Sequence, residues 1–135
     1  MRMHRIAIAI LLLALFFTAA SFAESETAAE APGIAASELS ARRASGTAPV
    51  VIDVRTSEEY AAGHIPGALN IPFDQVAQRI SEVEAPHGVA LYCMVGPRAR
   101  KGESALIAAG YTRVLHLDGG LAAWQAAGFP VEKSE

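Results

Sequence analysis

The chain contains one cysteine, Cys93, and the residues that follow it favour a reactive thiol. Cys93 directly follows the apolar residues 89–92, and Gly96 and Arg98 follow it at close spacing. A short loop of this kind before a helix can turn backbone N–H groups toward the sulfur, and the helix end and Arg98 add positive charge. These features favour a thiolate, the form that nucleophilic chemistry requires, and inward-facing amides can also hold an anion. The alternative is a buried and inert thiol at the end of a strand.

The elements that must position this loop alternate between strands and helices. Continuous β-branched or apolar runs predict buried strands, and apolar residues at helical spacing predict the segments between them. The strands are expected over residues 50–54, 68–71, 89–92 and 113–117. The helices are expected over 37–44, with Ser37 as N-cap, and over 57–63, 73–83, 98–109 and 121–127. Such alternation is typical of an α/β domain with a mostly parallel sheet, whose sites lie at the carboxyl ends of strands. Cys93 is at one of those ends.

The first 23 residues have the three parts of a secretory signal peptide. A basic start with Arg2 and Arg5 precedes an apolar run over residues 6–17, and small residues lead to an expected cut after Ala23. An uncleaved membrane anchor is the alternative, although the run is shorter than the roughly 20 residues that span a bilayer. We expect a signal peptide over 1–23, a flexible linker over 24–33, one domain over 34–135 and a periplasmic location, with no stable membrane span after cleavage.

Charge and cysteine usage limit the function classes. Cleavage removes two of the 11 basic residues and none of the 14 acidic ones, so the net charge moves from −3 to about −5. A nucleic-acid binder normally shows a basic face, and the sequence predicts none here. A single cysteine in an oxidising compartment cannot form an internal disulfide, so its thiol needs another explanation, either burial or reactivity.

Three separated blocks resemble the rhodanese family. The first runs from VIDVR at 51–55 through GHIPGA at 63–68 to NIP at 70–72. The second is C-x-x-G-x-R at 93–98. The third is L-x-G-G-x-x-x-W-x-x-x-G-x-P-V at 117–131. The chain is similar to the small single-domain rhodaneses that Gram-negative bacteria export. The resemblance covers about residues 34–131 and implies a five-stranded, mostly parallel sheet with helices on both faces.

The resemblance also implies a sulfurtransferase activity and assigns residue roles. Cys93 would take a sulfane sulfur from thiosulfate or a persulfide and pass it to a thiophilic acceptor, such as cyanide, a small thiol or a periplasmic thioredoxin-like protein. The substrate-binding loop would be formed by Met94, Val95, Gly96, Pro97, Arg98 and Ala99, with Arg98 over the sulfur. A loop of six residues from Cys93 to Arg98 suits sulfur, while a longer one suits the phosphate or arsenate of the family's phosphatases and arsenate reductases. A sulfur carrier or binding module with little turnover is the alternative function.

The other polar residues are expected to support the site. Asp53 and Arg55 would tie loops together beside it, and His64 would bond a backbone group. No second cysteine or histidine spacing suits zinc, so neither a metal nor an organic cofactor is expected. Pro97 departs from a simple amide loop because proline has no N–H. It either removes one donor to the sulfur or stiffens the loop.

Overall fold

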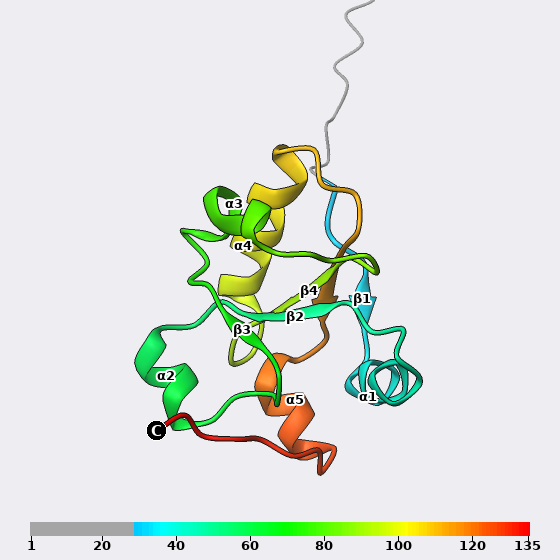
Figure 1. Cartoon of the computed structure of the whole chain (residues 1–135), viewed down its shortest axis with the longest axis vertical. Helices are drawn as coiled ribbons and strands as arrows, with labels where there is room; N and C mark the ends of the chain where they lie inside the picture. Colours follow the sequence, from blue (N-terminus) through cyan, green and yellow to red (C-terminus); the bar gives the residue numbers. More distant parts are fainter. Residues whose placement is uncertain (1–28) are drawn as a thin grey trace, which may run out of the picture.

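The computed structural model describes residues 29–135 and contains one five-stranded parallel sheet. The strand order is β1-β5-β4-β2-β3, and every pairing between neighbours is parallel. The bounds are β1 Gly33–Ile34, β2 Val50–Asp53, β3 Leu69–Asn70, β4 Val89–Tyr92 and β5 Val114–Leu117. β4 therefore lies in the middle of the sheet, and Cys93 directly follows it (Figure 1).

Helices cover both faces of the sheet, as the sequence predicts. α1 (Ala36–Ser45) and α5 (Gly120–Ala126) lie on one face, while α3 (Val76–Arg79), the 3₁₀ helix η1 (Ile80–Glu82) and α4 (Pro97–Ala108) lie on the other (Figure 1). α2 (Ser57–Ala62) follows the carboxyl end of β2. No helix in the described residues is both long enough and apolar enough to cross a membrane.

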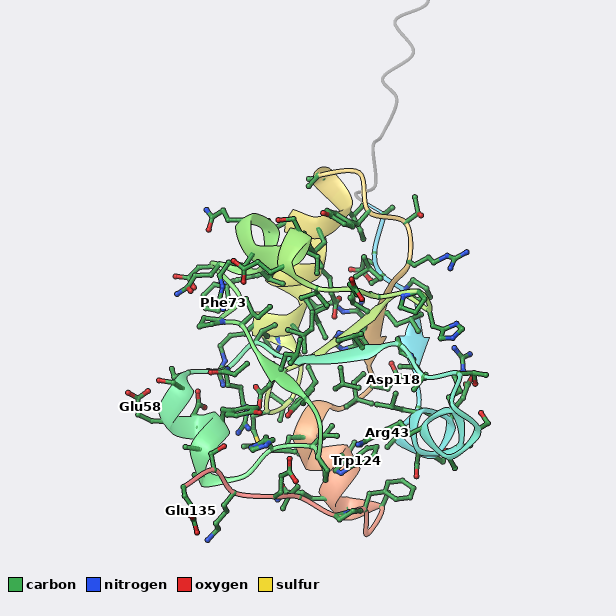
Figure 2. All side chains as sticks on the ribbon, in the orientation of Figure 1. Arg43, Glu58, Phe73, Asp118, Trp124 and Glu135 are labelled. Atoms are coloured by element: carbon green, nitrogen blue, oxygen red, sulfur yellow. The ribbon has the colours of Figure 1, made fainter. Side chains whose placement is uncertain are left out.

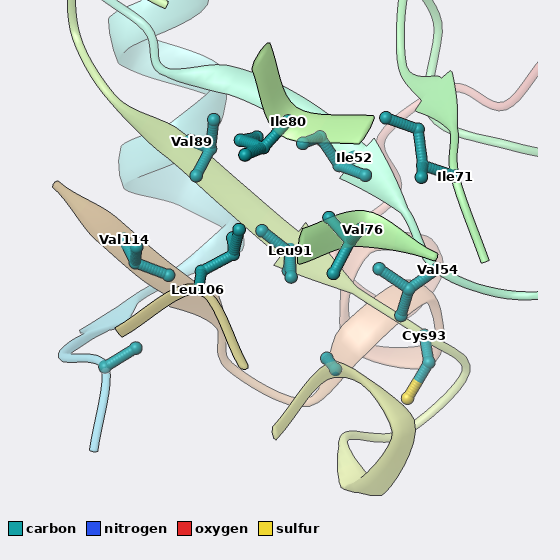
Figure 3. Packing of buried hydrophobic residues seen from close by; sticks show 12 residues of the cluster. Ile52, Val54, Ile71, Val76, Ile80, Val89, Leu91, Cys93, Leu106 and Val114 are labelled. Carbon is teal, nitrogen blue, oxygen red and sulfur yellow. The ribbon is translucent and has the colours of Figure 1, made fainter. Parts of the chain in front are cut away.

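Each face has its own apolar core. On the α3/α4 face, Cys93 lies at one end of a cluster that includes Leu91, Val54 and Leu106 (Figure 3). On the other face, Trp124 of α5 packs with residues of α1, and the Arg43 guanidinium lies 5.7 Å from the centre of its ring (Figure 2). The sheet is thus held between two packed layers, which fix the position of the loop that follows β4.

The amino-terminal side of the domain differs from the sequence expectation. β1 was not expected, because two residues give no periodic signal, and it lies at the end of the segment expected as a linker. Ala31 is buried, and Gly33 pairs with His116 of β5. The expected signal peptide over 1–23 and the start of the linker lie outside the described residues.

Two expected helix boundaries are wrong. Ser37 is not an N-cap: it lies in the first turn of α1, and Ala35 is the cap, because β1 leads directly into the helix. The segment expected as one helix over 73–83 begins its helix only at Val76 and tightens to 3₁₀ at Ile80. Val76 and Ile80 provide the helical spacing, while Phe73 and Val83 reach the same core from the flanking turns.

Candidate active site

The central strand places the Cys93 sulfur in a buried position with an amide donor. Cys93 is 1% exposed and follows Tyr92, the last residue of β4. The Gly96 backbone N–H donates a hydrogen bond to Cys93 Sγ over 3.1 Å. A backbone amide that donates to a cysteine sulfur can stabilise negative charge that develops on it, because hydrogen bonds to charged acceptors are the stronger ones. At least one loop amide therefore points inward, as the loop sequence predicts.

The rim of the loop is apolar and faces solvent. Met94 is 38% exposed and Val95 is 62% exposed, whereas Gly96 and Ala99 are buried. Gly96 has φ +148°, a conformation that side-chain-bearing residues rarely adopt. Pro97 is the first residue of α4, where a helix has no use for the N–H that proline lacks. The structure thus places Pro97 as a helix start that limits the length of the loop.

The start of α5 holds the loop from the opposite face. The Leu121 N–H donates to the Cys93 carbonyl over 2.9 Å, and the Ala122 N–H donates to the Met94 carbonyl over 3.0 Å. In a trans peptide the N–H points opposite to the C=O, so these contacts turn the amides of Met94 and Val95 away from α5. The Cys93 side chain packs on the α4 face, away from α5. Both amides are therefore aimed toward the face that holds the sulfur.

Gly120 makes this contact possible. A Cβ at Gly120 would lie 2.5 Å from the Cys93 carbonyl oxygen and 2.7 Å from that of Met94. Gly119 and Gly120 are the glycine pair of the third sequence block. The structure places the close approach of Gly120 on the backbone of the cysteine loop, and only the spacing of that block could have indicated it.

Arg98 forms a bidentate ion pair with Glu59 of α2. Its two terminal nitrogens donate to Glu59 Oε2 at 2.7 Å and Oε1 at 3.0 Å. Glu59 raises the pKa of Arg98, and the nearby charge of a Cys93 thiolate raises it further. Arg98 thus lies beside the sulfur, as the resemblance implies, but its guanidinium is already shared with a carboxylate.

Glu59 has a second role that connects the loop to α2. Thr56 caps α2, its hydroxyl accepts from the Glu59 N–H, and the Glu59 carboxylate accepts from the Thr56 N–H. The hydrogen bonds from Arg98 and then Thr56 lower the pKa of Glu59 to about 2. Nothing in the sequence singles out Glu59 as the partner of Arg98. The Thr56-x-x-Glu59 spacing was the available signal for the capping contact.

Asp53 and Arg55 form a buried network beside the loop. Arg55 Nη2 donates to Asp53 Oδ2 over 2.7 Å and to the Gly63 carbonyl over 2.7 Å. The Tyr92 hydroxyl donates to the same carboxylate over 2.9 Å and accepts from the Ile65 N–H. Burial raises the pKa of Tyr92, and the Asp53 charge adds to this shift, so the hydroxyl remains a donor. The network joins the end of β2 to the residue that precedes Cys93.

His64 lies in a separate contact. One ring nitrogen lies 2.7 Å from the Tyr60 carbonyl oxygen, and the other lies 3.2 Å from Glu132 Oε1. The ring also stacks on Tyr60 with 3.6 Å between centroids. None of these contacts in the described residues joins His64 to the cysteine loop, so the structure places it with the chain that follows α5 rather than with the sulfur.

Two hollows border the Arg98–Glu59 pair. One, of about 340 Å³, is lined by Arg98, Arg55 and Phe73 among others, and includes the acidic residues Glu58 and Asp74. The other, of about 170 Å³, is lined by Glu59, Met94, Gln125 and neighbours. The second hollow borders the loop at Met94, and the walls of the two hollows mix acidic, basic and apolar groups.

Known proteins are similar to this chain in sequence and in fold. The model of the rhodanese-like domain matches residues 35–127. A sulfurtransferase of Allochromatium vinosum is 38% identical over 97 residues, which cover 72% of this chain and 91% of that protein. The thiosulfate sulfurtransferase GlpE of Pseudoalteromonas translucida is 33% identical over 58% of this chain and 74% of its own.

A solved structure agrees with the fold. The rhodanese-like domain of the Anabaena protein Alr3790 has a TM-score of 0.69 and 33% identity, and it covers 76% of this chain and 80% of that one. The family match therefore extends over strands β2 to β5 and the loop that holds Cys93. The chain belongs to the rhodanese-like domain family.

Proposed function

We propose that this protein is a sulfurtransferase that carries a sulfane sulfur on Cys93. The observation that supports this most directly is the buried Cys93 sulfur at the end of the central strand, with the Gly96 N–H donating to it over 3.1 Å. The family model matches residues 35–127, which contain this loop, and relatives named as sulfurtransferases are similar to this chain.

The reaction divides into two displacements at sulfur. The Cys93 thiolate attacks the outer sulfur of the donor, the donor's bond to that sulfur breaks, and its remainder leaves with the electron pair. With thiosulfate the leaving group is sulfite. A nucleophilic acceptor then attacks the terminal sulfur and releases the Cys93 thiolate; with cyanide the product is thiocyanate. A covalent intermediate of this kind leads to ping-pong kinetics.

The residues around Cys93 have different parts in these steps. The Gly96 N–H and the inward-turned amides of Met94 and Val95 stabilise the negative charge on the thiolate and then on the persulfide. Arg98 adds positive charge beside the sulfur, but Glu59 balances most of it. Met94 and Val95 present an apolar rim to the donor or acceptor. This rim suits an organic persulfide or a protein thiol better than it suits the dianion thiosulfate.

The thiosulfate–cyanide assay tests the activity. Purified protein is incubated with thiosulfate and cyanide, and thiocyanate is measured for the wild type and for Cys93→Ser. Serine keeps the size of the side chain but cannot form a persulfide, so we expect its rate to fall to background. A wild-type rate equal to that of Cys93→Ser with both thiosulfate and an organic persulfide as donor would refute the sulfurtransferase proposal.

The proposal includes a compartment and an acceptor class. The basic start, apolar run and small residues before Glu24 support export to the periplasm. A periplasmic thioredoxin-like protein is an acceptor of fitting chemistry, since its thiolate can attack the terminal sulfur. The exposed Met94 and Val95 would then contact that protein. A sulfur carrier with slow release is the second candidate, favoured by the same apolar rim.

A further inference from the structure

A buried acid–histidine pair lies behind the cysteine loop and has no part in the steps above. Glu103 of α4 is 1% exposed and His116 of β5 is 6% exposed. His116 Nδ1 lies 2.6 Å from Glu103 Oε1. A buried carboxylate is costly unless it is hydrogen-bonded, and here His116 provides that contact.

The Glu103 carboxylate is held from both sides. Its second oxygen, Oε2, lies 3.4 Å from Arg100 Nη1, and the same nitrogen donates to the Ala31 carbonyl over 2.8 Å. Burial raises the pKa of Glu103, while the contacts with His116 and Arg100 oppose that shift. The contact between Glu103 Oε1 and His116 Nδ1 therefore sets the direction of the imidazole ring, whichever of the two groups donates.

The free edge of that ring faces the loop. A Cβ built on Gly96 would lie 3.6 Å from both Cε1 and Nε2 of His116. His116 is the register partner of Leu91, two residues before Cys93, and Leu91 and Cys93 pack on the same face of the sheet. The ring thus lies one strand away from the cysteine and against the residue whose N–H donates to the sulfur.

Gly96 needs such a support because its own backbone is permissive. Glycine rotates with little steric resistance, and at φ +148° no side chain of its own holds the peptide in place. A peptide that turns away from Sγ takes its N–H with it, and the sulfur then loses the donor. Packing from a fixed group behind Gly96 opposes that rotation.

We propose that Glu103 and His116 are a positioning pair that holds the Gly96 amide on Cys93 Sγ through the imidazole ring. The pair does not touch the donor or the acceptor. It deepens the proposed sulfurtransferase function, because the same amide would stabilise the persulfide.

Alkylation of Cys93 by iodoacetamide tests this without any sulfur donor. The rate is measured across pH for the full-length wild type, Glu103→Gln and His116→Phe. In His116→Phe, phenylalanine fills the volume of the imidazole ring but cannot form a hydrogen bond with Glu103. In Glu103→Gln, one oxygen of the carboxylate becomes an NH₂ group and the charge of the side chain is removed. We expect His116→Phe to lower the neutral-pH rate about tenfold, below the roughly 100-fold that loss of a whole anion donor costs, and to move the pH midpoint upward. Glu103→Gln should shift both in the same direction by less.

Leu106→Val is the matched control. Leu106 is fully buried and lies in the same helix as Glu103, one turn further from the loop. It belongs to the same core cluster as Cys93. We expect its alkylation profile to match the wild type although its thermal midpoint falls. A control shift as large as that of His116→Phe would overturn the proposal, because general loosening would then explain both.

Wild-type profiles in folded Glu103→Gln and His116→Phe would also overturn it. Should His116→Phe fail to fold, Glu103→Gln decides alone. Because iodoacetamide needs no sulfur transfer, a failed thiocyanate assay would refute the proposed function and leave this test valid.

Discussion

At the scale of single residues, Cys93 and Gly96 form the contact on which the proposed chemistry depends. Arg98 is not a free cation beside that contact. The Arg98 guanidinium donates two hydrogen bonds to Glu59, so little of its charge is free to attract a dianion. Both side chains are about one third exposed, and an ion pair at that exposure contributes at most about 1 kcal/mol. The pair therefore matters more for holding the loop against α2 than for stability.

The Glu59–Arg98 pair leads to a pH dependence of stability. The pKa of Glu59 lies at about 2 in the folded protein, below its ordinary value, so its contribution is present above about pH 4.5 and disappears as the pH falls toward 2. We expect Glu59→Gln to be less stable than the wild type by at most about 1 kcal/mol at pH 6, with the gap closing over that acid range. Urea unfolding at a series of pH values measures it.

Glu58→Gln is the control for this prediction. Glu58 is in the same turn of α2, and the described residues show it in no ion pair. Glutamine at 59 can also keep the capping contact with Thr56. A Glu59→Gln deficit that stays constant from pH 6 to pH 2, or one equal to that of Glu58→Gln, would contradict the account.

At the scale of elements, the cysteine loop is held by the start of α4 on one side and the start of α5 on the other. The contact with α4 can be predicted from the sequence, because a strand, a Gly-Pro pair and a helix succeed one another around Cys93. The contact with α5 joins positions more than 25 residues apart in sequence and depends on the turn between β5 and α5. α5 thus acts as part of the site although none of its side chains needs to touch the sulfur.

Gly120→Ala should disturb the loop from the α5 side. The added Cβ would lie 2.5 Å from a backbone oxygen of the loop, at a residue with φ +61°. The unfavourable φ costs about 1–2 kcal/mol, and the clash adds to it by pushing α5 off the Cys93 and Met94 carbonyls. We expect a lower thermal midpoint together with slower alkylation of Cys93.

Gly128→Ala separates these two effects. Gly128 ends α5, has φ +81°, and has open space where a Cβ would be. It should lose stability from the φ conformation while Cys93 reactivity remains at the wild-type value. Equal reactivity in Gly120→Ala and Gly128→Ala would mean that α5 does not position the loop.

The sequence predicts local features better than long-range pairs. β4 has the bounds of the strand predicted over 89–92, and the cysteine loop follows it as expected. Glu59–Arg98 and Glu103–His116 join residues 39 and 13 positions apart, and neither spacing is a helical or strand period. β1 was missed because two residues in a strand are fixed by pairing with β5 and not by their own pattern. The cap of α1 is predicted at Ser37 instead of Ala35 because the missed strand β1 leads directly into the helix.

At the scale of the whole molecule, the sheet brings the carboxyl ends of β2 and β4 together, and with them the Asp53 network and Cys93. The two cores on opposite faces of the sheet fix the positions of these strand ends. The chain after α2 and the chain after α5 pair beside them through His64 and Glu132. The proposed cleavage after Ala23 would leave the described domain intact, since its first strand begins at Gly33.

Export has a direct measurement. The full chain is expressed in a Gram-negative host, and the periplasmic fraction is analysed by intact mass. We expect a species that begins at Glu24, because the small residues Ser21 and Ala23 suit signal peptidase. Leu12→Arg, which interrupts the apolar run, should keep the protein inside the cell with its leader. Uncleaved wild-type protein in the membrane fraction would show an anchor instead.

The most direct test of the central claim is the mass of the protein after treatment with a sulfur donor. The purified protein is incubated with thiosulfate or an organic persulfide, desalted, and analysed by intact mass and peptide mapping. The account predicts an added mass of about 32 Da, one sulfur atom, on the Cys93 peptide, absent from Cys93→Ser and removed by cyanide. A stable adduct with slow release would favour the carrier function. No adduct on Cys93 with either donor would contradict the claim that this loop carries sulfur.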